Sequence, residues 1–227
     1  ALGMSGIAIA MSWLPLIFVV FLNEIKNTRY RRLIQTLTTI PNFISWVLVY
    51  AIAFAIFATD GFISSFMVNN GIWSEGRNML MNGNNIWIKL WMWGAWKSVG
   101  WSAIIYIASI SGIDTQLYEA ATVDGAGRFQ KMWSITIPQL MPTFLVLLLM
   151  SVANILSNGM DQYLVFENAT NTNKITVLDL YVYQLGLGSG SNIPLSTVVG
   201  MAKSLIGMTL LFAVNQFSKV VREESIF

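Results

Sequence analysis

The residues whose types and spacing could most readily carry out chemistry lie in one polar segment, residues 118–138, between two long apolar runs. Within it, Gly125 and Lys131 occupy the outer positions of a phosphate-binding loop of the form G-x-x-x-x-G-K-[ST]. Gln130 replaces the second glycine of that loop, and Met132 replaces the serine or threonine that would hold Mg²⁺. We therefore do not expect this chain to bind a nucleotide.

Two side-chain types that carry much of enzyme chemistry are missing, because the sequence contains no histidine and no cysteine. Their absence excludes a Ser-His-Asp triad, a thiolate nucleophile and zinc ligation by these residues. An intramembrane enzyme would then need a pair of acids, but Asp161 and Asp179 are both expected at the outer surface. We expect no catalytic site and no metal site.

The overall composition is that of a membrane protein. Hydrophobic residues make up 55% of the 227 residues and charged residues only 11%, about half the share usual in soluble domains. The segments long and apolar enough to cross a bilayer are residues 1–22, 33–59, 86–113, 132–160 and 192–218. A shorter apolar segment, 175–188, is expected to be a re-entrant or surface helix. The predicted fold class is all-α, a polytopic bundle of transmembrane helices.

The sequence begins inside an apolar run, without the positively charged region that opens a signal peptide. We expect at least one further span to precede it in the full protein. Residues 1–227 are interpreted as a single transmembrane domain, truncated at its N-terminus, with the polar region 114–138 near its centre.

The distribution of basic residues predicts the orientation of the chain. Three segments expected on one side of the membrane carry most of them: Lys26, Arg29, Arg31 and Arg32; Arg128 and Lys131; Lys219 and Arg222. The opposite side carries Arg77, Lys89 and Lys174. Because cytoplasmic loops are enriched in lysine and arginine, the polar region and the C-terminus are predicted to be cytoplasmic.

The polar region has the pattern of a helix, a glycine bend and a second helix. Asp114 or Thr115 can cap the first helix, and Gly125 and Gly127 permit a tight turn after it. The sequence RFQKMWSIT, which begins at Arg128, resumes a helical pattern. Such an element would form a compact surface projection rather than a pocket. We call this projection, from Thr115 to the residues before Pro138, the knob. An ordinary interfacial loop remains the alternative on these grounds alone.

The same residues resemble the EAA signature of ABC importer permeases, E-A-A, three residues, glycine, nine residues, then I-x-L-P. The matching residues are Glu119, Ala120, Ala121, Gly125, Ile135 and Pro138, with Ile137 where leucine is usual. Tyr118, Asp124, Ala126 and Gly127 fit the neighbouring positions. Residues 96–114 and several other segments look like the oligosaccharide branch of this superfamily.

The resemblance implies a transport subunit of a bacterial plasma (inner) membrane and no enzyme. Its EAA region, from Tyr118 to Pro138, would form a coupling helix that docks on a cytoplasmic ATPase dimer. ATP and Mg²⁺ would bind that ATPase, so this chain would hold no cofactor. Further implied partners are a second permease subunit, more often a different chain than a copy, an extracytoplasmic solute-binding protein and membrane lipid, with no nucleic acid. The implied cargo is an oligosaccharide or another carbohydrate; an amino acid, peptide or polyol is the alternative.

Candidates for the substrate path are aromatic and polar residues within or beside the predicted spans: Trp96, Lys97, Trp101, Asn158, Asp161, Gln162 and Tyr163. Tryptophans stack on sugar rings, but they also mark membrane interfaces, which is the better reading of Trp87 and Trp91. Charges inside spans tend to face a cavity or a partner, and Lys203 has no obvious acidic partner within the spans. Solvation of a loop is the alternative for residues 158–163.

Overall fold

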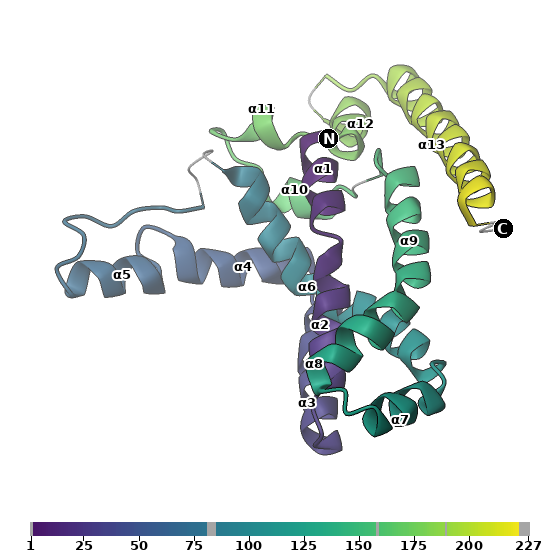
Figure 1. Cartoon of the computed structure of the whole chain (residues 1–227). Helices are drawn as coiled ribbons and strands as arrows, with labels where there is room; N and C mark the ends of the chain where they lie inside the picture. Colours follow the sequence, from purple (N-terminus) through teal and green to yellow (C-terminus); the bar gives the residue numbers. More distant parts are fainter. Residues whose placement is uncertain (1, 81–84, 158, 189, 223–227) are drawn as a thin grey trace. The chain divides into compact units, whose positions relative to one another are not determined.

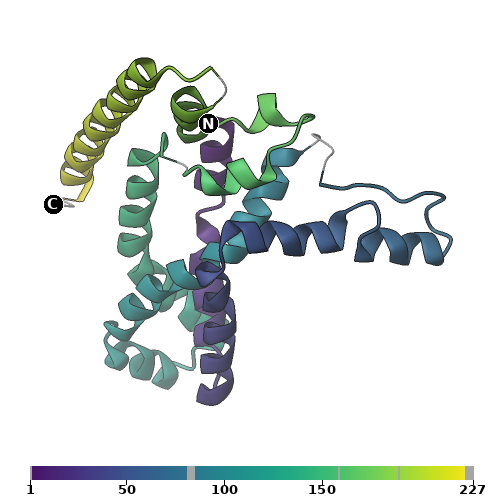
Figure 2. The same cartoon turned by 180° about the vertical axis from the view of Figure 1, so that it is seen from behind.

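The computed structural model describes residues 2–80, 85–157, 159–188 and 190–222, and every regular element in these ranges is helical. Figures 1 and 2 show the helices and their connecting loops from opposite sides. The chain divides into two compact units that alternate along the sequence. The first comprises residues 1–7, 44–93 and 154–211, and the second comprises residues 8–43, 94–153 and 212–227.

The second unit contains α2 (Trp13–Asn23), α3 (Thr28–Thr39), the 3₁₀ turn η1 (Ile40–Phe43), α7 (Thr115–Val123), α8 (Arg128–Lys131), the π-helical turn η2 (Met132–Thr136) and α9 (Ile137–Ala153). The first unit contains α4 (Trp46–Phe57), α5 (Phe62–Asn69), α10 (Asp161–Phe166), α11 (Thr172–Ile175) and α12 (Leu178–Leu187). Three helices contribute residues to both units: α1 (Leu2–Ala10), α6 (Ile86–Ser111) and α13 (Ile193–Arg222).

Four segments of the described chain meet the length and hydropathy needed to cross a membrane: Gly6–Asn23, Trp46–Asn69, Arg128–Ala153 and Ile193–Gln216. Between 6% and 28% of the residues of each are buried by the chain itself. Such exposure of apolar helices suits contact with lipid or with other membrane subunits. The remaining predicted span, residues 86–113, corresponds to α6, a continuous helix of 26 residues. Within the described chain, α6 is not among the segments that meet this length and hydropathy criterion.

The predicted span over residues 33–59 differs from the structure in its bounds. That region contains the end of α3, then η1 and α4, and the apolar segment itself begins at Trp46. Pro41 provides the physical reason, because proline cannot donate the backbone hydrogen bond that would continue α3. Ser45 then starts a new helix, as its hydroxyl accepts a hydrogen bond from the Leu48 amide at 3.4 Å.

The core of the second unit brings α2 and α6 together with the segment that leads into α9. Its buried residues are Leu16, Val19, Val20, Ala103, Tyr106, Met132, Leu140 and Phe144. The Trp13 and Phe144 rings lie 4.1 Å apart at their centroids. Gly100 allows a close backbone approach, because a β-carbon there would lie 2.2 Å from the Thr38 carbonyl oxygen. These contacts position the base of α9, where the polar region ends.

The core of the first unit joins α4, α6 and the segment from α10 to α12. Its buried residues are Ala53, Leu80, Ile86, Leu90, Tyr163, Phe166, Ile175, Val177 and Leu180. Tyr50 and Phe166 pack edge to face with centroids 5.1 Å apart. Asn171 is fully buried, and its side chain donates to the Phe166 carbonyl and accepts from the Asn168 amide. The buried asparagine therefore provides hydrogen-bond partners for backbone groups of its own loop. The predicted short helix over 175–188 is present as α12.

Candidate functional site

The first half of the polar region, α7, begins and ends with local hydrogen bonds. The Asp114 carboxylate caps its start by accepting from the Gln116 amide at 2.9 Å. At its end the Gly125 amide donates to the Thr122 carbonyl and the Ala126 amide donates to the Ala121 carbonyl. These two bonds form a Schellman motif, which requires a left-handed residue after the helix. Gly125 fills that position with φ +75°.

The second half begins at Gly127, which has ordinary extended backbone and caps α8. Figure 1 shows α7 and α8 joined by this bend, with α9 leading away from α8. The turn η2 lies between α8 and α9, and the Ile137 amide bonds to the Met132 carbonyl five residues back. Pro138 follows at once and cannot donate to the Ser134 carbonyl, which favours this wider turn. The predicted helix, glycine bend and helix are confirmed.

Side chains tie α7 to the base of α9. The Tyr118 hydroxyl lies 2.9 Å from the Thr136 hydroxyl, across 18 residues of sequence. Lys131 donates to the Thr122 hydroxyl, which itself donates to the Tyr118 carbonyl. Met132 and Thr136 are buried beneath these contacts. A displacement of α7 would therefore be passed on to the first turns of α9.

A further contact joins the polar region to the loop after α2. The Arg128 guanidinium donates to the Glu24 carbonyl at 3.2 Å and lies 3.5 Å from the Glu24 carboxylate. Both side chains are partly open to solvent, so this ion pair adds little stability by itself. It joins α8 to the loop after α2.

The surface of the polar region carries exposed apolar side chains. Val123 is 88% exposed, Phe129 71% and Trp133 67%. The Glu119 and Asp124 side chains are also exposed. Phe129 and Trp133 also belong to the apolar segment Arg128–Ala153, so their exposure suits contact with lipid or with another protein. The sequence analysis missed these three residues, although apolar residues on either side of the glycines were visible in the pattern.

The residues predicted to couple to an ATPase fall into two groups in the structure. Glu119, Ala120, Asp124, Gly125, Gly127 and Pro138 are exposed; Tyr118, Ala121, Ala126 and Ile135 are half-buried. The exposed residues are accessible to a partner, whereas the half-buried ones pack within the region.

The predicted path residues of the second unit, on α6, pack against η1. Lys97 donates to the Pro41 carbonyl at 3.2 Å and to the Asn42 carbonyl at 2.6 Å. The Trp101 ring meets Phe43 edge to face, with centroids 5.9 Å apart. The Lys97 ammonium thus donates hydrogen bonds to two carbonyls of the 3₁₀ turn. Trp96 is 41% exposed.

The predicted path residues of the first unit lie on α10, except Asn158, which falls outside the described residues. Gln162 donates to the Leu90 carbonyl at 2.6 Å, and Asp161 is exposed in the first turn. Tyr163 is 3% exposed. Its burial, together with the charge of Asp179, raises its pKa to about 12. Tyr163 therefore remains neutral and acts as a core residue.

An ion pair that the sequence analysis missed joins α12 to α13. The Lys203 ammonium binds Asp179 Oδ1, while Asp179 Oδ2 accepts from the Gly159 amide at 2.9 Å. Both side chains are about four-fifths buried. The partner of Lys203 comes from the short helix α12 rather than from a span, and 24 residues of sequence separate the two.

The tryptophans at the start of α6 differ in their surroundings. Trp91 packs against the core of the first unit, which the interface reading did not anticipate. Trp87 is 42% exposed, and its indole donates to the Lys174 carbonyl at 2.7 Å. Within the described part of the chain, no three His, Cys, Asp or Glu residues come together as metal ligands.

Replacing Gly125 by alanine should strain the Schellman turn, whereas the same change at Gly127 should not. The φ of +75° at Gly125 disfavours any β-carbon by about 1–2 kcal/mol, and both sites have open space around them. Amide hydrogen exchange across residues 121–127 should accelerate severalfold in Gly125→Ala and stay unchanged in Gly127→Ala. Equal exchange in the two variants would contradict the assigned role of Gly125.

The Asp179–Lys203 pair should be coupled energetically. Lys203→Met leaves the Asp179 carboxylate without its cation in a mostly buried place, which should cost about 1–3 kcal/mol of unfolding free energy. The double variant Asp179→Asn/Lys203→Met should recover most of that loss. The measurement is a double-mutant cycle on thermal unfolding in detergent, and strictly additive effects would refute the coupling.

The comparison with protein families matches residues 4–222 to the family described as binding-protein-dependent transport system inner membrane component. Two relatives from Bacillus subtilis (strain 168) align over 214 residues, or 94% of this chain. Protein LplB is 35% identical, and the polygalacturonan/rhamnogalacturonan transport system permease protein YteP is 36% identical. The chain spans 66% of the length of each, slightly less than two thirds.

Solved structures share the fold. A crystal structure of a bacterial ABC transporter involved in the import of the acidic polysaccharide alginate contains a chain 27% identical to this one, with a TM-score of 0.89. The match covers 97% of this chain and 77% of that one. A second structure, of a bacterial alginate ABC transporter in complex with an alginate pentasaccharide-bound periplasmic protein, gives 26% identity and a TM-score of 0.90. It covers 99% of this chain and 78% of that one. With nearly its whole length matched by the family model, this chain belongs to the family of binding-protein-dependent transport system inner membrane components.

Proposed function

We propose that this chain is the membrane-spanning permease subunit of a bacterial ATP-driven importer, and that its cargo is an oligosaccharide. The family membership, the four apolar spans and the carbohydrate systems named among its relatives support this proposal. The polar region and the C-terminus face the cytoplasm in this proposal, as the distribution of basic residues predicts.

The observation that carries the coupling part of the proposal is the geometry of the knob around Gly125. Its exposed face offers Val123, Phe129 and Trp133 to a partner. Its inner side is held to α9 by the Tyr118–Thr136 contact. A partner that pushes on the exposed face would move α7 and the base of α9 together, as in rigid-body transmission between domains. The partner we propose is a cytoplasmic ATPase dimer.

The nucleotide chemistry belongs to that ATPase in this proposal. The segment that approximates a phosphate-binding loop here is used as a Schellman turn, in which the amides of Gly125 and Ala126 bond to carbonyls of α7. Those amides are not free to cradle a phosphate. ATP and Mg²⁺ are therefore assigned to the partner, and this subunit is assigned transport without catalysis.

The remaining partners are proposed from the same assignment. A second permease subunit, more readily a different chain than a second copy, would complete the membrane path. An extracytoplasmic solute-binding protein would deliver the cargo, and the alginate-importer relative solved with a cargo-bound periplasmic protein supports this part.

The candidate path residues differ in how well they fit a role with substrate. Lys97 and Gln162 are engaged by backbone carbonyls, so we assign them to positioning α6 and α10. Trp96, Trp101 and Asp161 have exposed side chains, and we propose these for contact with cargo. Aromatic faces and carboxylates suit the stacking and hydrogen bonding of sugars. A non-sugar cargo is the alternative within the same machine.

An intramembrane enzyme that uses Asp161 and Asp179 as an acid pair finds no support. Asp179 already holds the Lys203 ammonium and the Gly159 amide through its two oxygens. The EAA spacing would also have no role in such an enzyme or in a purely structural membrane protein.

Replacing Val123 by aspartate should weaken association with the ATPase. The side chain is 88% exposed, so its change leaves the fold of the subunit intact while placing a charge in the docking face. Co-purification of the ATPase from membranes should fall about tenfold or more. Transport of the cargo should fall with it, while the amount of inserted permease stays the same.

Ile72→Asp provides the matched control. Ile72 is 62% exposed and lies beyond α5, after the apolar segment Trp46–Asn69, on the side predicted to be external. It receives the same charge and should leave ATPase association unchanged. Wild-type association in Val123→Asp, or an equal loss in Ile72→Asp, would refute the coupling proposal.

A further inference from the structure

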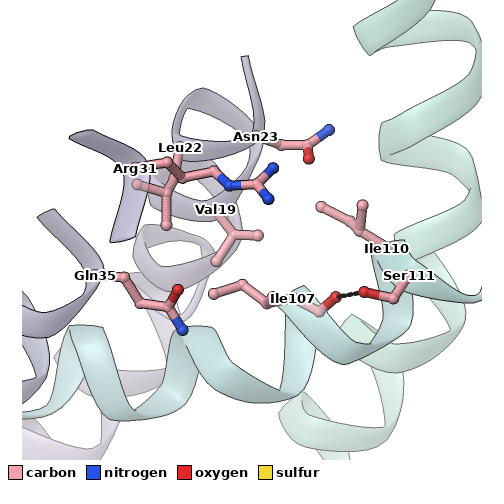
Figure 3. A pocket seen from close by; sticks show the side chains of 8 residues that line it. All are labelled: Val19, Leu22, Asn23, Arg31, Gln35, Ile107, Ile110 and Ser111. Carbon is pink, nitrogen blue, oxygen red and sulfur yellow. Dashed lines mark hydrogen bonds between the residues drawn. The ribbon is translucent and has the colours of Figure 1, made fainter. Parts of the chain in front are cut away.

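A small hollow lies within the second unit where the end of α2 meets α3 and the last turns of α6. Its volume is about 90 Å³, enough to hold water or a small polar group. Figure 3 shows the lining side chains: Val19, Leu22, Asn23, Arg31, Gln35, Ile107, Ile110 and Ser111. Neither the coupling knob nor the candidate path residues contribute to it.

The hollow is lined by cationic and amide side chains from α3 and α2 and by apolar side chains from α2 and α6. Arg31 and Gln35 are one turn apart on α3, so their side chains share one face of that helix. Both are half-buried, whereas Arg29 and Arg32 are exposed. Ile107 and Ile110 of α6 contribute to the apolar lining, as Figure 3 shows.

Arg31 is the charged group of this hollow. Within the part of the chain that the structure describes, its guanidinium forms no ion pair or hydrogen bond. Glu24, the nearest acid along the sequence, is engaged with Arg128. A half-buried guanidinium without a counter-charge favours an anion, and its planar donors match a phosphate group.

The position of the hollow relative to the membrane indicates what kind of anion it meets. Asn23 ends the apolar segment Gly6–Asn23, so the hollow lies at the boundary between hydrocarbon and water. The basic residues of the adjoining loop predict that this boundary lies in the cytoplasmic leaflet, which carries the anionic lipids. A ligand here needs an anionic head for Arg31 and an apolar part for Ile107 and Ile110.

We propose that this hollow binds the headgroup of an anionic phospholipid. The phosphate meets the Arg31 guanidinium, with the Gln35 and Asn23 amides beside it. The upper parts of the acyl chains lie over the isoleucines of α6. The site adds a lipid ligand to the proposed transport function and does not depend on the ATPase contact.

The test compares lipid retention by the assembled transporter, purified from membranes and analysed by native mass spectrometry. Phosphatidylglycerol and phosphatidylcholine with identical acyl chains are added to the delipidated protein. Arg31→Gln should retain about tenfold less phosphatidylglycerol than wild type, because a charge-assisted bond to phosphate is lost. Arg32→Gln, the same change on the exposed neighbouring residue, should retain the wild-type amount.

A second variant fills the hollow without altering its charge. Ser111 lies in its lining, and its hydroxyl donates to the Ile107 carbonyl of its own helix. Ser111→Phe should displace phosphatidylglycerol to a similar extent as Arg31→Gln. This variant carries the test if Arg31→Gln fails to assemble.

Four outcomes would overturn the proposal. Equal losses in Arg31→Gln and Arg32→Gln would indicate diffuse attraction to the basic loop. Equal retention of phosphatidylcholine would show that the anionic head is not recognised. Displacement of the lipid by millimolar inorganic phosphate would identify a free anion as the ligand. Cross-linking of position 111 to another protein segment would show that protein fills the hollow.

Discussion

The left-handed turn at Gly125 is the constraint on which the polar region depends. It reverses the chain after α7 with two Schellman hydrogen bonds and directs α8 back toward the base of α9. The Tyr118–Thr136 contact can form only once that reversal is made, since 18 residues separate the two hydroxyls. The exposed apolar face of the knob and its rigid attachment to α9 both follow from the same turn. A residue with a β-carbon at this position would loosen all three features together.

Other contacts within the second unit hold in place the helices to which the knob is joined. Gly100 lets the α6 backbone approach the end of α3, and Lys97 satisfies the carbonyls of η1 from the same helix. Phe144 and Leu140 pack α9 against α2 and α6. Arg128 joins α8 to the loop after α2. A force applied at the knob would therefore meet a packed helix pair rather than a free loop, as the proposed coupling role requires.

Local signals allowed much of this arrangement to be predicted from the sequence. Asp114, Gly125 and Pro138 act on neighbouring residues, so the helix, bend and helix could be predicted, and composition alone located most spans. Pro41 shows the limit of composition: the apolar run hides a helix break that only backbone hydrogen bonding decides. Contacts between residues far apart in the sequence could not be predicted from it. The partner of Lys203 is Asp179, 24 residues away, and those of Lys97 are backbone carbonyls, which carry no sequence signature.

The absence of cysteine from the sequence gives a direct way to test where the knob docks. A single Val123→Cys substitution provides a thiol that is unique within residues 1–227, on the most exposed apolar residue of the knob. Treatment of membranes that contain the assembled transporter with a short thiol- and amine-reactive cross-linker should join position 123 to the ATPase. The same experiment with Ile72→Cys should give no such product. Cross-linking of Ile72→Cys to the ATPase, or of Val123→Cys to every neighbour except the ATPase, would contradict the coupling role of this region.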